Sequence, residues 1–213
     1  MPGPSPAQQS LTLQEAIDLG LQHHNAGDLP EAEGIYQQIL QTDPNHLVAL
    51  HMLGVISHQK GENDTAVDLI TRVLSIKPEY PEAHSNLGLT LQEIGRLDEA
   101  VIHFHKALAI KPDYPEAHNN LGLAFYELGR LDEAVIHYHK ALAINPDYAV
   151  AYNNLGNTLQ ELGRMEDAIS HYQKALAIQP DYADVHNNLG AAFQNLRKLD
   201  EAVVSHQKAL AIK

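Results

Sequence analysis

An internal repeat of 34 residues constrains the fold of this 213-residue chain more than any other feature. Residues 81–114 and 115–148 are identical at 27 of 34 positions. A period of this length is typical of repeat proteins, in which each copy is a small unit that buries its apolar face against its neighbours. The columns that keep the interval are Gly20, Gly54, Gly88, Gly122, Gly156 and Gly190; Ala32, Ala66, Ala100, Ala134, Ala168 and Ala202; and Pro44, Pro78, Pro112, Pro146 and Pro180.

Each copy carries the pattern of two helices. In the copy at 115–148, an apolar stripe at helical spacing lies on each side of the segment GRLDEA. Gly129 in that segment can adopt the left-handed conformation that ends a first helix, and Pro146 breaks the second helix. Gly122 lies in mid-helix, where glycine costs about 1 kcal/mol relative to alanine, so we expect another helix to approach closely there. The stripes are Ala117, Leu121 and Phe125, and Ala134, Tyr138 and Ala141.

Together these residues resemble the tetratricopeptide repeat (TPR). The resemblance implies an all-α fold, a right-handed superhelical solenoid of six helix-turn-helix repeats whose first helices line a concave groove. Arg197 departs from the pattern, which has glycine at this position, and so leaves the last inter-helix turn open to question. The usual tryptophan position is held by His84, His118, Tyr152 and His186. We expect a flexible Pro-rich arm at 1–12 and a repeat array at 13–213, divided as 13–46, 47–80, 81–114, 115–148, 149–182 and 183–213.

The last four copies place one asparagine on the groove side of the first helix, opposite the buried stripe. An amide both donates and accepts hydrogen bonds, so a ladder of them can hold the backbone of an extended peptide without reading its side chains. The alternative is that each asparagine bonds to a neighbouring repeat and fixes its twist, and the two roles are compatible. We expect the adjacent Asn119, Asn153 and Asn187, nearer the helix flank, to be solvated. The ladder residues are Asn86, Asn120, Asn154 and Asn188.

The expected groove is acidic around this ladder. Among the Lys and Arg residues, only Lys60, at a helix end, comes near the groove columns. The resemblance therefore implies that the basic clamp of TPR co-chaperones, which holds the terminal carboxylate of a chaperone, is missing. We expect a protein or peptide partner with a neutral or basic extended segment, against the alternative of a solvated acidic face. The flanking candidate residues are Glu82, Glu93, Glu116, Glu127, Asn157 and Glu161.

The groove columns of the first two copies are apolar instead. They hold Leu21, Val48, Met52 and Val55. Such residues could supply a hydrophobic anchor or contact a partner helix.

The composition removes several classes of function. With 27 acidic residues against 14 Lys and Arg, the formal charge of −13 opposes binding to nucleic acid or an anionic membrane, and argues against an RNA-reading helical repeat of similar length. The sequence has no cysteine, no basic and apolar leader, and no apolar run long enough to span a membrane. We therefore expect a cytoplasmic protein.

Neither a metal site nor a catalytic site is expected. His103 and His105 are two residues apart on a helix and point in different directions, and equivalent histidines of successive copies should be about 10 Å apart. The sequence has no phosphate-binding loop and no nucleophile motif, and every candidate acid recurs with the repeat. We expect no cofactor and no enzymatic activity.

The sequence thus predicts a protein-interaction scaffold that binds an extended polypeptide in its groove. As the alternative, the HNNLG and GRLDEA blocks resemble the N-terminal repeats of bacterial proteins related to O-GlcNAc transferases, which implies recruitment of substrate for a catalytic domain not present in this sequence. The sequence stops at Lys213, where the next proline is due, so that Leu210 lacks a following helix. We expect either a longer natural protein or self-association through this uncapped last repeat.

Overall fold

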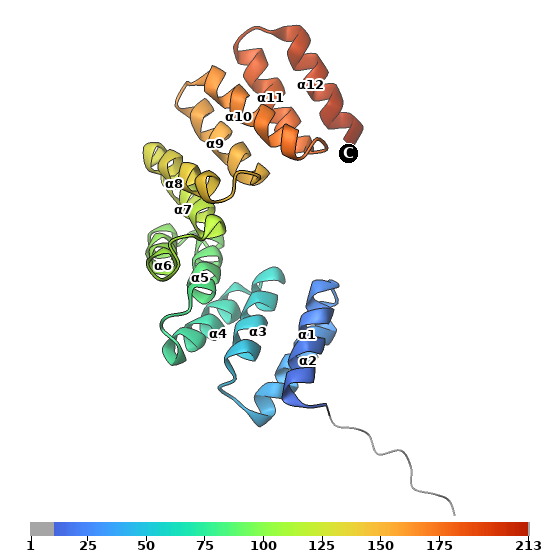
Figure 1. Cartoon of the computed structure of the whole chain (residues 1–213), viewed down its shortest axis with the longest axis vertical. Helices are drawn as coiled ribbons and strands as arrows, with labels where there is room; N and C mark the ends of the chain where they lie inside the picture. The colour runs from blue at the N-terminus through green and yellow to red at the C-terminus, as the bar shows by residue number, and fades with distance from the viewer. Residues whose placement is uncertain (1–10, 213) are drawn as a thin grey trace, which may run out of the picture. The chain divides into compact units, whose positions relative to one another are not determined.

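The computed structural model describes residues 11–212, which form twelve α-helices and no strand (Figure 1). Most of the expected arm at 1–12 lies outside the described residues. The chain divides into two compact units, one ending at Ile94 and one beginning at Gly95. The first unit holds α1 (Leu13–Asn25), α2 (Leu29–Thr42), α3 (Leu47–Gln59), α4 (Asn63–Ile76) and α5 (Pro81–Glu93). The second holds α6 (Leu97–Ile110), α7 (Pro115–Glu127), α8 (Leu131–Ile144), α9 (Ala149–Glu161), α10 (Met165–Ile178), α11 (Ala183–Asn195) and α12 (Leu199–Ile212).

Consecutive helices pack as hairpins within each unit. In the first unit, α1 packs on α2 and α3 on α4, and in the second unit the pairs are α7 with α8, α9 with α10, and α11 with α12. Each pair then packs on the first helix of the next repeat in the same unit. This confirms the predicted all-α arrangement of helix-turn-helix repeats.

The helix ends follow from local chemistry. At the start of α1, the Thr12 hydroxyl accepts from the backbone of Glu15 and the Glu15 carboxylate accepts from the backbone of Thr12, which forms a capping box. Five inter-helix turns place a glycine in the left-handed region, with φ of +81° at Gly27 and +72° at Gly129. Arg197 takes the same conformation, with φ of +59°, so the last turn forms despite the missing glycine.

One buried cluster of the first unit lies between α1, α2 and α3. Ile17, Tyr36, Leu53 and Ile56 belong to this cluster, and Tyr36 and Ile56 are at most 1% exposed. Of the apolar groove residues expected in the first two copies, Leu21, Val48 and Met52 pack against this cluster with part of their surface still exposed. Val55 is half-buried.

In the second unit, the mid-helix glycines Gly122 and Gly156 each face a buried tyrosine ring of the same repeat. A Cβ on Gly122 would lie 2.8 Å from Cε1 of Tyr138, and a Cβ on Gly156 would lie 2.5 Å from Cε1 of Tyr172. Both tyrosines have no exposed surface. The close helix approach predicted at Gly122 is confirmed, because any side chain there would occupy the space of the ring.

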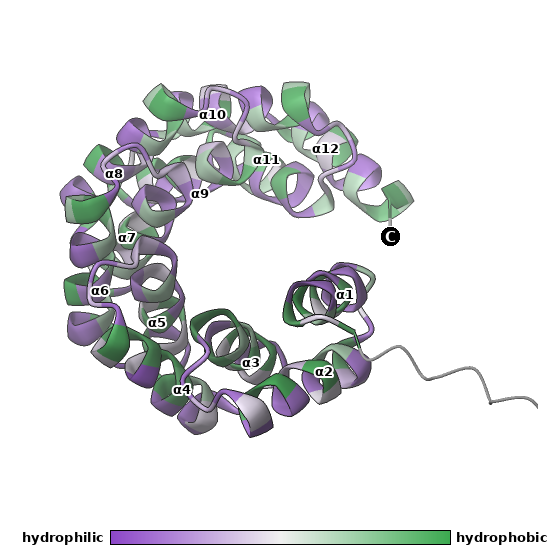
Figure 2. Cartoon of the chain, turned by 60° about the horizontal axis from the view of Figure 1, so that its bottom comes forward, coloured by the Kyte–Doolittle hydropathy of each residue, from purple (hydrophilic) through white to green (hydrophobic). Residues whose placement is uncertain are grey.

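Hydrophobic and hydrophilic residues alternate along the labelled helices, as expected for amphipathic helices (Figure 2). Among residues 11–212, no helix combines the length and the apolar character that crossing a membrane requires.

Candidate functional site

The four ladder asparagines occupy equivalent places on first helices, one each on α5, α7, α9 and α11. Asn86 belongs to the first unit, and Asn120, Asn154 and Asn188 belong to the second. All four are half-buried. Part of each side chain is therefore accessible to solvent.

Within the second unit, Asn154 and Asn188 bond to the preceding first helix, whereas Oδ1 of Asn120 accepts from Nδ2 of Asn119 on its own helix. Nδ2 of Asn154 donates to Oδ1 of Asn119 over 3.1 Å, and Nδ2 of Asn188 donates to Oδ1 of Asn153 over 2.9 Å. The donor always follows its acceptor by 35 residues. We call such a hydrogen bond an asparagine rung. The rungs support the structural role that the sequence left open for these residues.

The expectation that the adjacent asparagines are solvated was wrong for two of them. Asn119 is 4% exposed and Asn153 is 8% exposed, because their position lies in the seam between successive first helices. Asn187 is half-buried and has Nδ1 of His206 at 3.4 Å from its Oδ1. The recurring pair of asparagines thus supplies the acceptor of one rung and the donor of another.

The first unit contains a rung of the same spacing with histidine as the acceptor. Nδ2 of Asn86 lies 2.9 Å from Nε2 of His51, and the phenol oxygen of Tyr80 lies 3.2 Å from Nδ1 of that ring. A neutral imidazole that accepts at Nε2 donates at Nδ1, so His51 donates to Tyr80. Burial lowers the pKa of His51 below its usual value, and the Glu82 carboxylate opposes this shift. Burial has the larger effect, so the pKa stays lowered and the neutral ring, which can accept the hydrogen bond from Asn86, is favoured.

A second set of contacts with the same 35-residue spacing joins the ends of the first helices. Nε2 of His24 lies 2.9 Å from Oε1 of Gln59, and Nδ1 of His58 lies 3.0 Å from Oε2 of Glu93. The pKa of Tyr126 is raised, first by burial and then by Glu161 of the next repeat. These contacts place the acids at 93 and 161 beside polar groups of the preceding helix.

The remaining candidate acids lie on the same helices. Glu93, Glu116, Glu127 and Glu161 are exposed, and Glu82 is half-buried near the start of α5. Each unit therefore shows carboxylates next to its ladder asparagines. These side chains can attract a basic segment, although partly solvated charges do so with modest energy.

Asn157 interrupts the apolar groove column formed by Leu89 and Leu123 in earlier copies. Its Oδ1 accepts from the Tyr172 hydroxyl at 2.8 Å and from Nδ2 of Asn188 at 3.0 Å. Asn188 is thus anchored at two points, Asn153 and Asn157. This network was not predicted from the sequence, in which the paired asparagines were the available signal.

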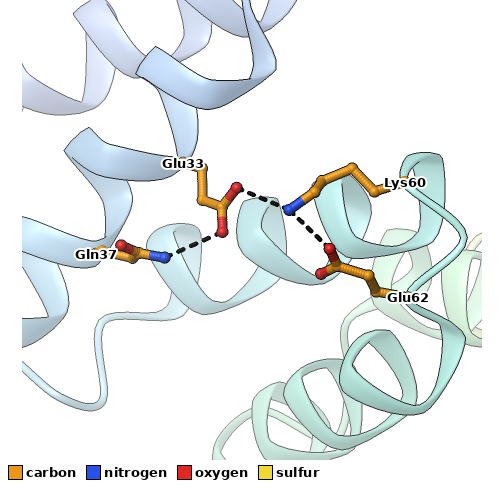
Figure 3. A network of polar contacts seen from close by, with 4 residues as sticks. All are labelled: Glu33, Gln37, Lys60 and Glu62. Atoms are coloured by element: carbon orange, nitrogen blue, oxygen red, sulfur yellow. Dashed lines mark hydrogen bonds and ion pairs between the residues drawn. The ribbon is translucent and has the colours of Figure 1, made fainter.

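Lys60, the base nearest the groove columns, is already paired. Its Nζ lies 3.1 Å from Oε2 of Glu33 and 2.8 Å from Oε1 of Glu62, and Gln37 donates to the other oxygen of Glu33 (Figure 3). The ammonium group is engaged by two carboxylates of the protein itself. This arrangement does not provide a carboxylate clamp for a partner.

Histidines of successive second helices contact each other, but the two partners occupy different positions of the repeat. The rings of His105 and His137 are 6.0 Å apart, and those of His139 and His171 are 6.1 Å apart. In the described part of the chain, no three His, Asp or Glu side chains are arranged to hold a metal ion. The contacts are ring packing between neighbouring repeats.

Three family models match the sequence. Two are described as tetratricopeptide repeat, one matching residues 24–88 and the other 113–181 and 147–213. A third, described as TPR repeat, matches residues 93–129. The chain belongs to the tetratricopeptide repeat family. The matches run along both units, which agrees with the helix pairs seen in each.

Solved TPR structures show the same fold. MamA is 29% identical over 75% of this chain and 94% of its own, with a TM-score of 0.68. A thermophilic TPR protein of Thermus thermophilus is 23% identical over 85% of this chain and 98% of its own, with a TM-score of 0.71. PilF of Pseudomonas aeruginosa is 19% identical over 94% and 97%, with a TM-score of 0.80. A search of curated proteins returned no match.

Repeat proteins of this kind bind other proteins through the extended surfaces that their stacked helices create. The family matches identify the tetratricopeptide repeat. They do not distinguish the repeats of O-GlcNAc-transferase-like proteins from other repeats of the family.

Proposed function

We propose that the first helices of this TPR protein bind an extended polypeptide segment that is neutral or basic. The observation that carries the proposal is the geometry of the asparagine rungs. In the described contacts, Asn154 and Asn188 use Nδ2 for the rungs, and their Oδ1 atoms accept no protein hydrogen bond. A half-buried amide held in this way presents a fixed acceptor to a backbone N–H of a ligand. Asn154, whose Nδ2 makes one hydrogen bond within the protein, also has a second N–H that can donate to a backbone carbonyl.

The rungs pre-organise the groove, because each amide is oriented before a ligand arrives. Pre-organised groups lose less conformational freedom on binding, so more of the hydrogen-bond energy contributes to affinity. Glu116 and Glu161, both exposed, flank the asparagines of α7 and α9 and favour lysine or arginine in the ligand. The structural and binding roles of the asparagines thus support each other.

A matched pair of substitutions separates these roles. Asn188→Ala removes a groove amide together with its rung, whereas Asn153→Ala removes only the rung acceptor and leaves Asn188 held by Asn157. A peptide would first be selected from a random library with the unmodified protein. We expect Asn188→Ala to weaken its binding about tenfold, through the loss of the hydrogen bond that Oδ1 accepts from the ligand, and Asn153→Ala to weaken it less than about threefold.

Circular dichroism melting of both variants provides the folding control. An equal loss of affinity in the two variants, in step with their melting temperatures, would contradict the proposal. It would show that the asparagines only hold the repeats together. Replacing Glu116 and Glu161 by glutamine should weaken binding of lysine-containing peptides and reduce its dependence on salt.

The same surface could recruit substrate in a longer O-GlcNAc-transferase-like protein, since the resemblance of the HNNLG and GRLDEA blocks implies that repeats of that group hold substrate through an asparagine ladder. In that case the selected peptides should contain a serine or threonine at a fixed place. Selection without such a preference favours the general scaffold.

Self-association through the last repeat stays a prediction, and the structure narrows its form. Leu199 and Leu210 on α12 are 63% and 75% exposed, whereas Leu142, equivalent to Leu210, is 8% exposed. In the described interfaces between repeats of one unit, the first helix of the following repeat has a fully buried Ala or Val as its third residue. These residues are Ala49, Ala83, Ala117, Ala151 and Val185. The first helix, α1, has Glu15 at this place, so head-to-tail stacking would bury a carboxylate. We therefore expect any dimer to pair two α12 faces, which sedimentation of Leu210→Lys against the unmodified chain would check.

A further inference from the structure

A cavity of about 920 Å³ opens between the second helices α10 and α12. Its floor is formed by His186, Leu189 and Phe193 of α11, and its walls include Gln173 of α10 and Ser205 of α12. All of these residues belong to the second unit. The cavity does not lie on the exposed end of the array, because Leu199, Val203 and Leu210 do not line it.

The equivalent groove of the fourth repeat is filled by an imidazole. The ring of His137 lies 5.4 Å from that of His118, 5.5 Å from that of Phe125 and 6.0 Å from that of His105. His118 and Phe125 come from α7, whereas His105 comes from α6 and His137 from α8. One ring from the later second helix thus closes the groove over the first helix.

The groove of the fifth repeat is closed in the same way. His171 of α10 lies 5.8 Å from Tyr152 of α9, nearly parallel to it, and 6.1 Å from His139 of α8. The position that closes the groove is again the seventh residue of the second helix.

The sixth repeat keeps the surroundings and lacks the closing ring. Counting in steps of 34 and 68, His186 corresponds to His118 and Phe193 to Phe125, but Ser205 takes the place of His137 and His171. Gln173 likewise replaces His105 and His139. Ser205 donates to the backbone oxygen of Glu201 over 2.8 Å and does not extend into the space. The cavity therefore includes the space that a ring at position 205 would occupy.

His186 is left with an unsatisfied nitrogen at this place. The ring is 7% exposed, its Nε2 lies 2.9 Å from the backbone oxygen of Pro180, and its Nδ1 is buried without a hydrogen-bond partner. In the fourth repeat, Nε2 of His118 makes the same bond to Pro112, and its Nδ1 lies 3.2 Å from Nδ1 of His137. With Nε2–H donating, a neutral His186 offers Nδ1 as an acceptor. The missing group is thus an aromatic ring that carries a hydrogen-bond donor.

The charged residues at the edge of the cavity indicate which kind of ligand would supply the aromatic ring. Three carboxylates, on Asp181, Asp200 and Glu201, line it together with one ammonium, on Lys208. A space of about 920 Å³ also exceeds what one ring fills, which leaves room for flanking residues. Both features favour a polypeptide with basic residues beside the aromatic one over a small molecule.

We propose that the cavity between α10 and α12 binds a partner polypeptide by inserting one of its tyrosine, histidine or tryptophan side chains beside His186 and Phe193, flanked by basic residues. This site lies on second helices and goes beyond the proposed function of the first-helix surface. It does not require the asparagine rungs. The partner would complete in trans the packing that His137 and His171 complete within the chain.

The test uses the whole chain and blocked tripeptides at pH 7.5, followed by NMR of the His186 and Phe193 ring signals. Ac-Lys-Tyr-Lys-NH2 and Ac-Lys-His-Lys-NH2 carry a ring donor, and Ac-Lys-Phe-Lys-NH2 is the matched peptide without one. We expect at least one donor peptide to shift both signals and to bind about fivefold more tightly than the phenylalanine peptide, the effect of one hydrogen bond. Phenol and imidazole alone should bind more weakly than the peptides.

Ser205→His provides the decisive variant, because it restores the ring found in the fourth and fifth repeats. It should raise the melting temperature and abolish peptide binding, whereas Ser205→Ala should leave binding unchanged. Ser170→His, at an exposed place on α10 outside the cavity, controls for the added imidazole. Should Ser205→His fail to fold, Gln173→His tests the same space from the other wall.

Three results would overturn the proposal. Peptide binding that persists in Ser205→His and Gln173→His would place the site elsewhere. Equal affinity of all three peptides would remove the role of the His186 nitrogen. Binding of phenol or imidazole as tight as that of the peptides would point to a small-molecule site instead.

Discussion

Replacing Gly156 by alanine should destabilise the chain, whereas the same change at Gly34 should stabilise it. A Cβ at Gly156 would lie 2.5 Å from Cε1 and 2.7 Å from Cδ1 of Tyr172, about 1 Å closer than ordinary contact. The ring cannot withdraw easily, because it is fully buried and its hydroxyl donates to Asn157 and Gln160. At Gly34 in α2, a Cβ would meet no atom within 4 Å.

The magnitudes follow from two opposing effects. Overpacking of a tight interface costs about 1–3 kcal/mol, and alanine recovers up to about 1 kcal/mol of helix propensity. Gly156→Ala should therefore lose about 1–2 kcal/mol, or about 2–8 °C in melting temperature for a chain of this size. Gly34→Ala creates no close contact, so only the higher helix propensity of alanine remains. The free energy of unfolding should rise by about 0.5–1 kcal/mol.

Thermal melting followed by circular dichroism measures both effects. The control is the double variant Gly156→Ala, Tyr172→Ala, compared with Tyr172→Ala alone. Without the tyrosine ring, the methyl group added at position 156 should no longer lower the melting temperature. If Gly156→Ala melted at or above the temperature of the unmodified chain, the reasoning from close approach would be refuted. The paired helices would then separate at little cost.

Three further outcomes are expected. Arg197→Gly should raise the melting temperature, because relief of a left-handed non-glycine residue is worth about 1 kcal/mol, and Arg197→Ala should give no such gain. Burial, followed by nearby positive charges, lowers the pKa of His137 and His171 to about 4, so the unfolded chain, titrating near 6.5, takes up these protons first. Stability in urea should therefore fall as pH drops from about 6.5 towards 4, by about 1–2 kcal/mol per ring after allowance for partial exposure, and His137→Gln should reduce this slope. Lys60→Met should leave the melting temperature unchanged at low and high salt, since its ion pairs are exposed, and a fall of several degrees would contradict this view.

The sequence was sufficient to predict the helices because each helix signal, the apolar stripe, the glycine and the proline, recurs at the same interval of 34 residues. A glycine that ends five of the first helices and a proline after most of the second helices leave little freedom in the boundaries. The last turn shows how far this extends. The backbone N–H groups of Arg197 and Lys198 donate to the carbonyls of Gln194 and Phe193 at the end of α11. The residues at 129 and 130 make the equivalent hydrogen bonds at the end of α7, so the turn after α11 forms without glycine.

The sequence could not decide which asparagine of each pair is buried. Asn119 and Asn120 are separated by about 100° around one helix, and both lie near the seam with the next first helix. The choice depends on how the following repeat is rotated, which is a property of tertiary packing. For the same reason the sequence missed the meeting of His105 with His137, since adjacent second helices bring together positions that differ by 32 residues.

The cavity beside His186 was also beyond prediction from the sequence. It results from two replacements, Gln173 and Ser205, in an otherwise periodic set of histidines. Polar residues on second helices normally indicate a solvated face, and only the packing of the earlier repeats shows that a ring belongs there.

The spacing of the asparagine rungs has a consequence for how the array can change in length. The repeat measures 34 residues and each rung spans 35, so Asn153 and Asn154 serve opposite neighbours, one as acceptor and one as donor. A copy that carries both asparagines is complementary to itself. Duplication of residues 149–182, in evolution or in the laboratory, would thus create a new junction with its hydrogen bond already in place, and removal of a whole copy would rejoin compatible ends. An insertion of part of a copy within a first helix would rotate the asparagine away from the seam and separate the donor from its acceptor.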